Sequence, residues 1–584
     1  MIFFCLFFFF SSALSLSLND FMGTKALYVP RLSASSNSLP SSQQCVAKSL
    51  ALVLRHGARQ PSQSDLARLV QLQSDLRGAR IGDAALNASL RAWSVPYGAD
   101  DAGLLTTLGA DEHYRIGVRL RARYPSLFAR PYTPSRYRFV STRVSRAARS
   151  AQSLAFGLFE KDGIVGGPLN NTYLPVFVEM VATDDDFLLR FFKLCPAYAR
   201  YEARCCDGKD EFMQRTLAPV AAQLSQRLAG DSAAVGWNVT IDQVRAIYTA
   251  CQFENSFGDQ APLFCPLLSQ EALAALEFIG DVERERAGAR GNPAHDCAAD
   301  LVRAMRDSMQ ACANSNGSCA TPVSLWFAHA ETIIPLSSAL RLYEAQPLLS
   351  WNATPPPPSE LSSWPLSQVS PFAANIGFML YECAQNVTPD GRWLVQAIAN
   401  EGPVAMPGGN DTVTLEQWLS PALYGKLLTV NSTQLCYSTS NATANSTASN
   451  ADRANDVLSP TDVIVVACVA ALGLFVCSLS AYCATAARNR SIRSERQGKF
   501  QTTYSAEKEA AALSNRFLDI SATQVIRKRR SGGAETSPSL TSDGGGGGGN
   551  DDDDDDDDNA AVSIVPDNQK RAAITEGIRD FLSD

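Results

Sequence analysis

The most constraining feature of this chain is an uninterrupted apolar run close to its C-terminal end. Residues 463–487 form a stretch of 25 residues without a charged side chain, which is long enough for a membrane-spanning helix of about 20 residues. Basic residues follow at once, at Arg488, Arg490, Arg493, Arg496 and Lys499. Because basic residues mark the cytosolic flank of a span, the pattern predicts a single-pass type I membrane protein. Its residues before 463 are expected in the lumen or outside the cell.

A second apolar segment stands at the other end of the chain. Residues 2–17, IFFCLFFFFSSALSLS, carry no charge, and small residues follow the apolar core at Ala13, Ser15 and Ser17. This composition is typical of a secretory signal peptide. We therefore predict a signal peptide over residues 1–17, with cleavage near Ser15 or Ser17.

The residues after the predicted span have the composition of a disordered tail. Six glycines at 544–549 and eight aspartates at 551–558 form runs that cannot bury a core. Residues 488–584 are therefore predicted to be a disordered cytosolic tail. The arginines beside the span have two interpretations: they bind anionic lipid, or they only fix the orientation of the span.

Glycosylation signals and cysteines agree with this topology. Asn-x-Ser/Thr sequons lie between the two apolar segments, at Asn87, Asn170, Asn238, Asn316, Asn352, Asn386, Asn410, Asn431, Asn441 and Asn445. The last two fall in residues 441–462, which we interpret as a glycosylated stalk. Eleven cysteines lie in the same part of the chain and none lies in the tail, as expected for an oxidising exterior and a reducing cytosol.

Two pairs of cysteines are close enough in sequence to form local disulfides. They are Cys251 with Cys265, and Cys312 with Cys319. Because eleven is an odd number, at least one thiol is free or bonds to another chain.

The charge balance excludes a general polyanion-binding protein. The tail holds 14 basic and 18 acidic residues, which leaves 37 basic and 41 acidic residues in the rest of the chain. Since the outer part is nearly neutral, attraction to an anionic ligand must come from a local cluster of cations. We expect no nucleic-acid partner, and the residues indicate no particular oligomeric state.

The first candidate site follows a short apolar run. Residues 49–54, SLALVL, end at Arg55 and His56, and Arg59 follows three positions later. A short apolar run with a polar boundary is typical of a buried parallel strand. In open α/β sheets, ligands bind just beyond the carboxyl ends of the strands.

The same arrangement occurs a second time. Residues 323–328, VSLWFA, form an apolar run that ends at His329, and Glu331 follows two positions later. A helical pattern comes next. This second strand end is therefore expected to bring a histidine and a carboxylate to the same edge of the sheet.

A third strand end is rich in arginine. Residues 137–140, YRFV, are strand-like, and Arg143, Arg146 and Arg149 follow before a helical pattern. Spacing alone does not decide which of the three arginines faces the site and which lie on a solvated helix face.

These three strand ends predict a site for cleaving a phosphate monoester. A guanidinium group can bind two phosphate oxygens at once through parallel hydrogen bonds. A neutral histidine such as His56 can attack phosphorus. Glu331 is the only carboxylate in the two histidine loops, so it is the candidate acid for the leaving oxygen. We interpret His113 and His295 as surface or core residues. No zinc-binding spacing is present, and we expect no metal or cofactor.

The motifs at these strand ends resemble those of a known family. Residues 55–61, Arg-His-Gly-Ala-Arg-Gln-Pro, match the Arg-His-Gly-x-Arg-x-Pro signature of the histidine acid phosphatases, and His329-Ala330-Glu331 resembles the multiple inositol polyphosphate phosphatase branch, where most relatives have His-Asp. Further similar segments are 188–198, 250–257, 327–340 and 369–383. The resemblance extends from about Cys45 to Cys436.

The resemblance implies roles for the catalytic residues. His56 is implied as the nucleophile that forms a phosphohistidine, and His329 as a further phosphate ligand. Glu331 is implied as the proton donor to the leaving group. No metal is implied.

The resemblance also implies which arginines bind the transferred phosphate. Arg55 and Arg59 belong to the signature itself. Arg146 best matches the third arginine of the family, because STRVSRAARSA follows its pattern of Ser-Thr, three residues, Arg, and then Ser-Ala.

The fold implied by the resemblance is an α/β sandwich with a mainly α-helical inserted domain. The α/β core is expected over residues 40–165 and 320–440, and the helical insert over 166–319. Lysines or arginines of the insert are expected to set the preference for polyphosphorylated ligands. In this chain, unlike most of the branch, one transmembrane helix is expected to follow the phosphatase fold.

Three functions stay open on the sequence alone. The first is a phosphatase of phytate and lower inositol phosphates, which the resemblance extends to 2,3-bisphosphoglycerate. The second is a broad acid phosphatase of simple monoesters. The third is a glycosylated surface receptor that has lost activity, although the intact set of catalytic residues argues against it. The first two share a small anionic phosphorylated substrate.

Overall fold

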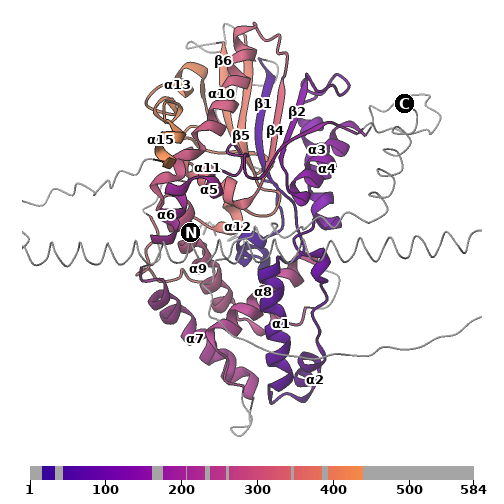
Figure 1. The fold of residues 1–584 in the computed structure, drawn as a ribbon, viewed down its shortest axis with the longest axis vertical. Helices are drawn as coiled ribbons and strands as arrows, with labels where there is room; N and C mark the ends of the chain where they lie inside the picture. The colour runs from indigo at the N-terminus through magenta and orange to yellow at the C-terminus, as the bar shows by residue number, and fades with distance from the viewer. Residues whose placement is uncertain are drawn as a thin grey trace, which may run out of the picture. The chain divides into compact units, whose positions relative to one another are not determined.

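An eight-stranded sheet organises the fold in the computed structural model (Figure 1). The structure describes residues 16–32, 44–160, 175–204, 207–230, 237–257, 262–343, 348–384 and 392–437. The strands are β1 (Cys45–Arg55), β2 (Tyr137–Thr142), β3 (Val178–Val181), β4 (Val323–Ala328), β5 (Asn375–Cys383), β6 (Trp393–Ala399), β7 (Gly402–Pro403) and β8 (Thr412–Thr414).

The helices surround this sheet and form a second layer beyond it. They are α1 (Gln63–Gly78), α2 (Ala84–Ala92), α3 (Thr107–Arg123), α4 (Ser145–Phe159), α5 (Phe191–Leu194), α6 (Pro196–Arg204), α7 (Lys209–Ala229), α8 (Ile241–Phe257), α9 (Gln270–Gly288), α10 (Ala299–Asn314), α11 (Ala330–Ala339), α12 (Leu366–Val369), α13 (Leu415–Leu419), α14 (Gly425–Leu428) and α15 (Ser432–Tyr437). Short 3-10 helices include η1 (Leu18–Phe21), η2 (Gly23–Lys25) and η5 (Pro293–Ala298).

The three strand ends expected to converge belong to neighbouring strands. The sheet order is β3-β2-β4-β1-β5-β6-β7, with β8 paired to β6. β4 runs parallel to both β1 and β2, so the carboxyl ends of all three strands meet at one edge of the sheet. On the other side of β1, β5 pairs antiparallel with β1, and β6 pairs antiparallel with β5.

Alternating side chains of the central strands bury both faces of the sheet. Ala51 and Val53 join one hydrophobic core with α10 and α11, whereas Leu50 and Leu52 join another core with α3 and α4. Figure 1 shows these two pairs of helices on opposite sides of the strands. A sheet covered on both faces is the three-layer sandwich expected from nearly continuous apolar strands.

A third core forms the helical layer. It gathers apolar residues of α1, α7, α8 and α9, together with Phe21 and Met22 of the N-terminal segment. Figure 1 shows these helices beyond one end of the sheet. Leu69, Leu72 and Leu76 of α1 are buried here, and their spacing of three and four residues places them on one face of the helix.

The boundaries of the two layers differ from those predicted. β3 and α10 lie within the expected insert, residues 166–319, yet β3 pairs with β2 and α10 packs on the sheet. Conversely, α1 lies within the expected core segment 40–165 but packs in the helical layer. The periodicity of a helix shows which face is apolar but not which partner covers that face, so the sequence could not place these elements.

Several predictions fall outside the described residues. They are residues 1–15 of the signal peptide, the stalk 441–462, the span 463–487, the tail 488–584 and the sequons Asn170, Asn386, Asn441 and Asn445. Of the sequons that the structure describes, Asn87 is half-buried and the others are exposed: Asn238, Asn316, Asn352, Asn410 and Asn431. Within the described ranges, no helix combines the length and apolar character needed to cross a bilayer.

Four disulfides close the described part of the chain. The two local pairs predicted from sequence are present, Cys251–Cys265 and Cys312–Cys319. Two long-range disulfides were not predicted: Cys45–Cys383 joins β1 to β5, and Cys195–Cys436 joins the α5–α6 junction to α15. Their cysteines are 338 and 241 residues apart in the sequence, so nothing in the sequence indicates that they pair. Cys297 is a buried free thiol within the described residues.

Candidate active site

His56 is fixed directly after β1 with one ring nitrogen held by its own loop. Its backbone N–H donates to the carbonyl of Ala328, at the end of the neighbouring β4. The ring Nδ1 lies 2.8 Å from the carbonyl oxygen of Gly57. Because a carbonyl oxygen only accepts hydrogen bonds, Nδ1 must carry the proton. The other nitrogen, Nε2, is therefore the one with a lone pair, as a nucleophile requires.

Helices α3 and α4 hold the backbone of this loop. The Ala58 N–H donates to Oε2 of Glu112 at 2.8 Å, and the Gly57 N–H donates to Oγ of Ser150 at 3.1 Å. His113 donates from Nε2 to the carbonyl of Arg55 at 3.0 Å. Each peptide group around His56 thus has a side-chain partner from a packed helix.

The roles of Glu112 and His113 were not recognised from the sequence. Both are buried. Burial lowers the pKa of His113 to about 4, so its ring is neutral and its single N–H can serve the Arg55 carbonyl. Burial raises the pKa of Glu112 to about 7 although it accepts two backbone N–H groups. His113 is a core residue, as interpreted, but it bonds directly to the backbone of the His56 loop.

Two glycines allow α3 to come so close. A Cβ atom on Gly57 would lie 2.3 Å from the carbonyl oxygen of Gly109, and a Cβ on Gly109 would lie 2.1 Å from the carbonyl oxygen of Ala58. Both distances are far below van der Waals contact. The glycine of the Arg-His-Gly motif is therefore required by helix packing against the loop.

Arg55 and Arg59 are buried at the two ends of the loop. Nη1 of Arg55 donates to the carbonyl oxygens of Thr24 at 2.5 Å and Ser370 at 2.7 Å. Its guanidinium lies over the ring of Phe372, 4.7 Å from the centroid. Nη1 of Arg59 lies 3.3 Å from Oδ2 of Asp65 in α1. These contacts hold both cations close to His56 without help from a ligand.

Arg146 is the arginine of the third strand end that enters the site. It is 2% exposed, whereas Arg143 and Arg149 are exposed on the surface. Arg146 lies in the first turn of α4, and its Nη2 is 3.5 Å from Nδ1 of His329. Solvent exposure thus distinguishes Arg146 from Arg143 and Arg149, which their spacing in the sequence could not do.

His329 joins this cluster from the end of β4. It is fully buried and precedes α11. Its Nε2 lies 3.1 Å from Oγ1 of Thr142, the last residue of β2. The rings of His56 and His329 are 5.6 Å apart between centroids. The three neighbouring strands therefore deliver two histidines and their arginines to one place.

The cluster keeps His56 neutral. Burial is the largest cause that lowers its pKa well below the ordinary 6.5, and the nearby Arg146 and Arg55 lower it further. A buried histidine beside cations loses its proton easily because the charged ring is poorly solvated and repelled. The same cations are left to attract an anion.

Glu331 lies in the first turn of α11, two residues after His329, and is half-buried. Its side chain lines a cavity of about 20 Å³, enough for about one water molecule. Lys193, Tyr198 and Arg284 line the same cavity. The structure thus gathers His56, His329 and the three arginines in one cluster, while Glu331 lines a small cavity of its own.

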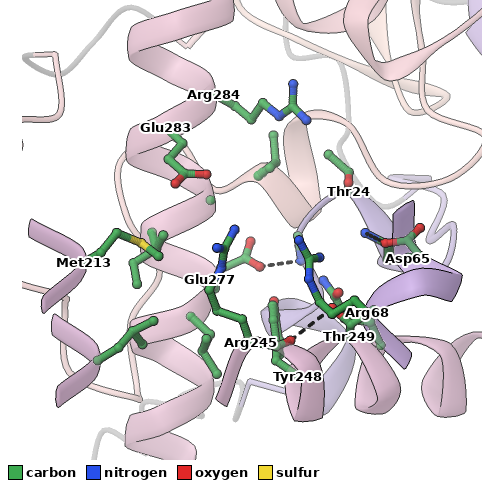
Figure 2. A pocket seen from close by; sticks show the side chains of 18 of the residues that line it. Thr24, Asp65, Arg68, Met213, Arg245, Tyr248, Thr249, Glu277, Glu283 and Arg284 are labelled. Carbon is green, nitrogen blue, oxygen red and sulfur yellow. Dashed lines mark hydrogen bonds and ion pairs between the residues drawn. The ribbon is translucent and has the colours of Figure 1, made fainter. Parts of the chain in front are cut away.

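A larger cationic pocket lies on the helical side of the site (Figure 2). Its volume is about 110 Å³. Two of its walls touch Arg55 and Arg59, because Thr24 accepts from Arg55 and Asp65 pairs with Arg59. The acidic and basic side chains that line it are Lys25, Asp65, Arg68, Arg245, Glu277, Glu283 and Arg284.

Four cations and three carboxylates line the pocket. Figure 2 shows that the side chains of Arg68 from α1 and Arg245 from α8 both line this pocket. Arg284 of α9 lines both this pocket and the Glu331 cavity. Cations were predicted from the helical insert without being identified; Arg245 and Arg284 lie within its predicted bounds, and Arg68 lies outside them. No local pattern marks them, since they meet only through the packing of three helices.

Comparison with known proteins agrees with this geometry. The multiple inositol polyphosphate phosphatase 1 of Gallus gallus is 25% identical over 422 residues, covering 68% of this chain and 88% of the relative. That of Dictyostelium discoideum is 29% identical over 427 residues, covering 64% of this chain and 65% of the relative. The crystal structure of the phytase from D. castellii has a similar fold, with a TM-score of 0.57 at 18% identity, covering 72% of this chain and 88% of that one.

The family assignment rests on a match to a family model. Residues 47–400, well over half of the chain, match the histidine phosphatase superfamily (branch 2). This range contains both histidine loops, the third strand end and three of the four cations of the pocket, all but Lys25. The chain therefore belongs to branch 2 of the histidine phosphatase superfamily.

Proposed function

We propose that this protein is a phosphomonoester hydrolase that removes phosphates from inositol polyphosphates, including phytate and lower inositol phosphates. The observation that carries the proposal is the cluster of three buried arginines around a neutral, buried His56, beside a cationic pocket. Relatives named multiple inositol polyphosphate phosphatase 1 and phytase support the substrate class.

The reaction takes place in two displacements. Nε2 of His56 attacks phosphorus, the bond to the leaving oxygen breaks, and Glu331 gives its proton to that oxygen. Water then attacks the phosphohistidine, the phosphorus–nitrogen bond breaks, and Glu331 takes up the proton. Neutral His56 and inorganic phosphate result, so the enzyme returns to its starting state.

The arginines stabilise the charge of the transferred group. Arg55, Arg59 and Arg146 are fixed before substrate arrives, so they need no reorganisation when charge spreads over the equatorial oxygens. His329 is oriented by Thr142 and completes the phosphate site. Removing one such fixed donor costs about 100-fold to 1,000-fold in turnover in comparable sites.

The pocket supports a preference for substrates with several phosphates. A monoester with one phosphate fills only the His56 cluster, whereas the other phosphates of an inositol polyphosphate reach Arg68 and Arg245. A broad acid phosphatase would not depend on those two residues. The preference is therefore a property of the pocket, not of the catalytic cluster.

Phosphate release by the full chain tests this function. We expect the wild type to release phosphate from phytate at about pH 4 to 7 without added metal, and His56→Ala to release none. Turnover of a small aryl phosphate without turnover of phytate would replace the proposal with a broad acid phosphatase. A folded, glycosylated protein inactive on both substrates would favour a receptor.

We also propose that the catalytic part faces the lumen or the cell exterior, anchored by residues 463–487. The proposal is supported by the basic residues that follow this apolar run and by exposed sequons such as Asn238 and Asn410. In sealed membranes, glycosidase treatment and protease protection should place residues 16–437 on the lumenal side. Protease access to them from the cytosolic side would contradict this topology.

A further inference from the structure

Arg55 is held in place by two backbone segments that are far apart in the sequence. Its Nη1 donates to the carbonyl of Thr24 in η2 and to the carbonyl of Ser370 at the end of α12. Neither carbonyl belongs to the strand or loop that carries Arg55. The position of its guanidinium therefore depends on whatever fixes these two segments.

A single buried carboxylate on α9 binds both segments. Oε2 of Glu277 accepts the N–H of Gly23, the neighbour of Thr24, at 2.5 Å. Oε1 of Glu277 accepts the N–H of Ser367, in the first turn of α12, at 2.9 Å. Glu277 is 2% exposed. Its two oxygens thus connect the two segments that present carbonyls to Arg55.

A second buried acid one helical turn further on strengthens this arrangement. Asp281 accepts the N–H of Leu366 through Oδ1 at 2.7 Å and the hydroxyl of Ser362 through Oδ2 at 2.5 Å. It is fully buried. α12 is therefore held at its first two residues by two carboxylates of the same helix.

We propose that Glu277 is a positioning residue for the phosphate-binding Arg55. Its carboxylate holds η2 and α12 at the distance at which Thr24 and Ser370 orient the guanidinium. This inference rests on the proposed function, because it assumes that Arg55 binds the transferred phosphate. Glu277 does not touch the reacting atoms, and it acts only through the two backbone segments.

An alternative role for Glu277 predicts an effect of opposite sign. Glu277 also lines the cationic pocket, so its negative charge opposes anion binding there. Replacing it by glutamine removes that charge and would strengthen anion binding if charge were its only influence. A positioning role predicts weaker binding, because glutamine has one acceptor oxygen where the carboxylate has two.

The test compares Glu277→Gln with Glu283→Gln in the full chain. Glu283 lies on the same helix, lines the same pocket and pairs with Lys209, outside the Arg55 supports. At pH 8, we expect Glu277→Gln to raise the inhibition constant of inorganic phosphate by about tenfold, the usual effect of losing a hydrogen bond to a charged group. Glu283→Gln should lower that constant.

A pH comparison separates positioning from general loosening of the fold. Burial raises the pKa of Glu277 to about 7, so its carboxyl takes up a proton in mild acid and loses one acceptor. The ratio of the inhibition constant of Glu277→Gln to that of the wild type should therefore fall toward one at pH 5.5. The ionisable groups that interact with Glu277 are Asp20, Tyr248 and Asp281, and those sharing its pocket are Lys25, Asp65, Arg68, Arg245, Glu283 and Arg284.

The outcomes distinguish this inference from the proposed function. A wild type without turnover on any phosphomonoester would overturn the proposed function. An active wild type in which Glu277→Gln behaves like Glu283→Gln at pH 8, or keeps the same ratio at both pH values, would overturn the inference alone.

A second measurement uses only the wild type, so it tests the inference even if Glu277→Gln does not fold. Because coupling is reciprocal, inorganic phosphate bound at Arg55 should slow hydrogen exchange at the amides of Gly23 and Ser367. Unchanged exchange at both amides under saturating phosphate would contradict the positioning role.

Discussion

Substitution of Gly57 by alanine tests how strictly the catalytic loop is positioned. The added Cβ would lie 2.3 Å from the carbonyl oxygen of Gly109, whereas an ordinary contact needs about 3.4 Å or more. The loop or α3 must therefore move by about 1 Å. Relief elsewhere is restricted, since the loop peptides are bonded to Ser150 and Glu112.

A displacement of this size should be visible in turnover. Misplacing a catalytic group by about 1 Å can cost about 100-fold in rate, and overpacking typically costs about 1 to 3 kcal/mol of stability. We expect Gly57→Ala to fold with a lowered melting temperature and to show a kcat about 100-fold below wild type. The assay is steady-state phosphate release from phytate, combined with thermal unfolding of the same sample.

The matched control is Gly78→Ala at the end of α1. No atom lies within 4 Å of a Cβ at that position, and alanine is a better helix former than glycine by up to about 1 kcal/mol. This variant should keep wild-type kcat and equal or higher stability. A Gly57→Ala enzyme with wild-type kcat would refute the argument that the approach of α3 fixes His56.

Three further predictions follow from the site. Arg146→Ala should lower kcat/KM by about 100-fold or more, as expected for a fixed donor to the transferred phosphate, while Arg143→Ala should change it by less than about twofold because Arg143 is exposed. Equal effects in the two variants would contradict the site. Because the pKa of His56 is lowered, its ring stays neutral at pH values somewhat below 6.5. The acidic limb of a plot of kcat/KM against pH should therefore be centred clearly below pH 6.5. A limb centred at 6.5 or above would show an unperturbed nucleophile. Arg245→Ala should raise KM for phytate by about tenfold and leave KM for a small aryl phosphate unchanged; equal changes for both substrates would place Arg245 outside a polyphosphate subsite.

The sequence predicted the residues that are close together along the chain. Arg55, His56 and Arg59 share one loop, so a strand followed by that loop is enough to place them. The convergence of three strand ends was also predicted, because parallel strands present their carboxyl ends at one edge. The choice of Arg146 over its neighbours came from a family resemblance, and burial agrees with it.

The residues that support the site could not be predicted in this way. Glu112 and Glu277 lie on helices of ordinary composition, and their acceptor oxygens matter only because distant backbone segments reach them. The same reason applies to Thr24, whose carbonyl contacts Arg55 from a segment that the sequence analysis left unassigned. Such contacts depend on how layers pack, and the hydrophobic periodicity of a single helix does not encode the partner of its apolar face.

The most direct test of the account is to find where the phosphoryl group resides during turnover. The full chain is mixed with phytate, quenched at short times under alkaline conditions that preserve phosphohistidine, and mapped by peptide mass spectrometry. We predict one phosphate on the peptide that carries His56, absent from His56→Ala. Full turnover with phosphate on another residue, or with none on His56 at any quench time, would contradict the proposed nucleophile.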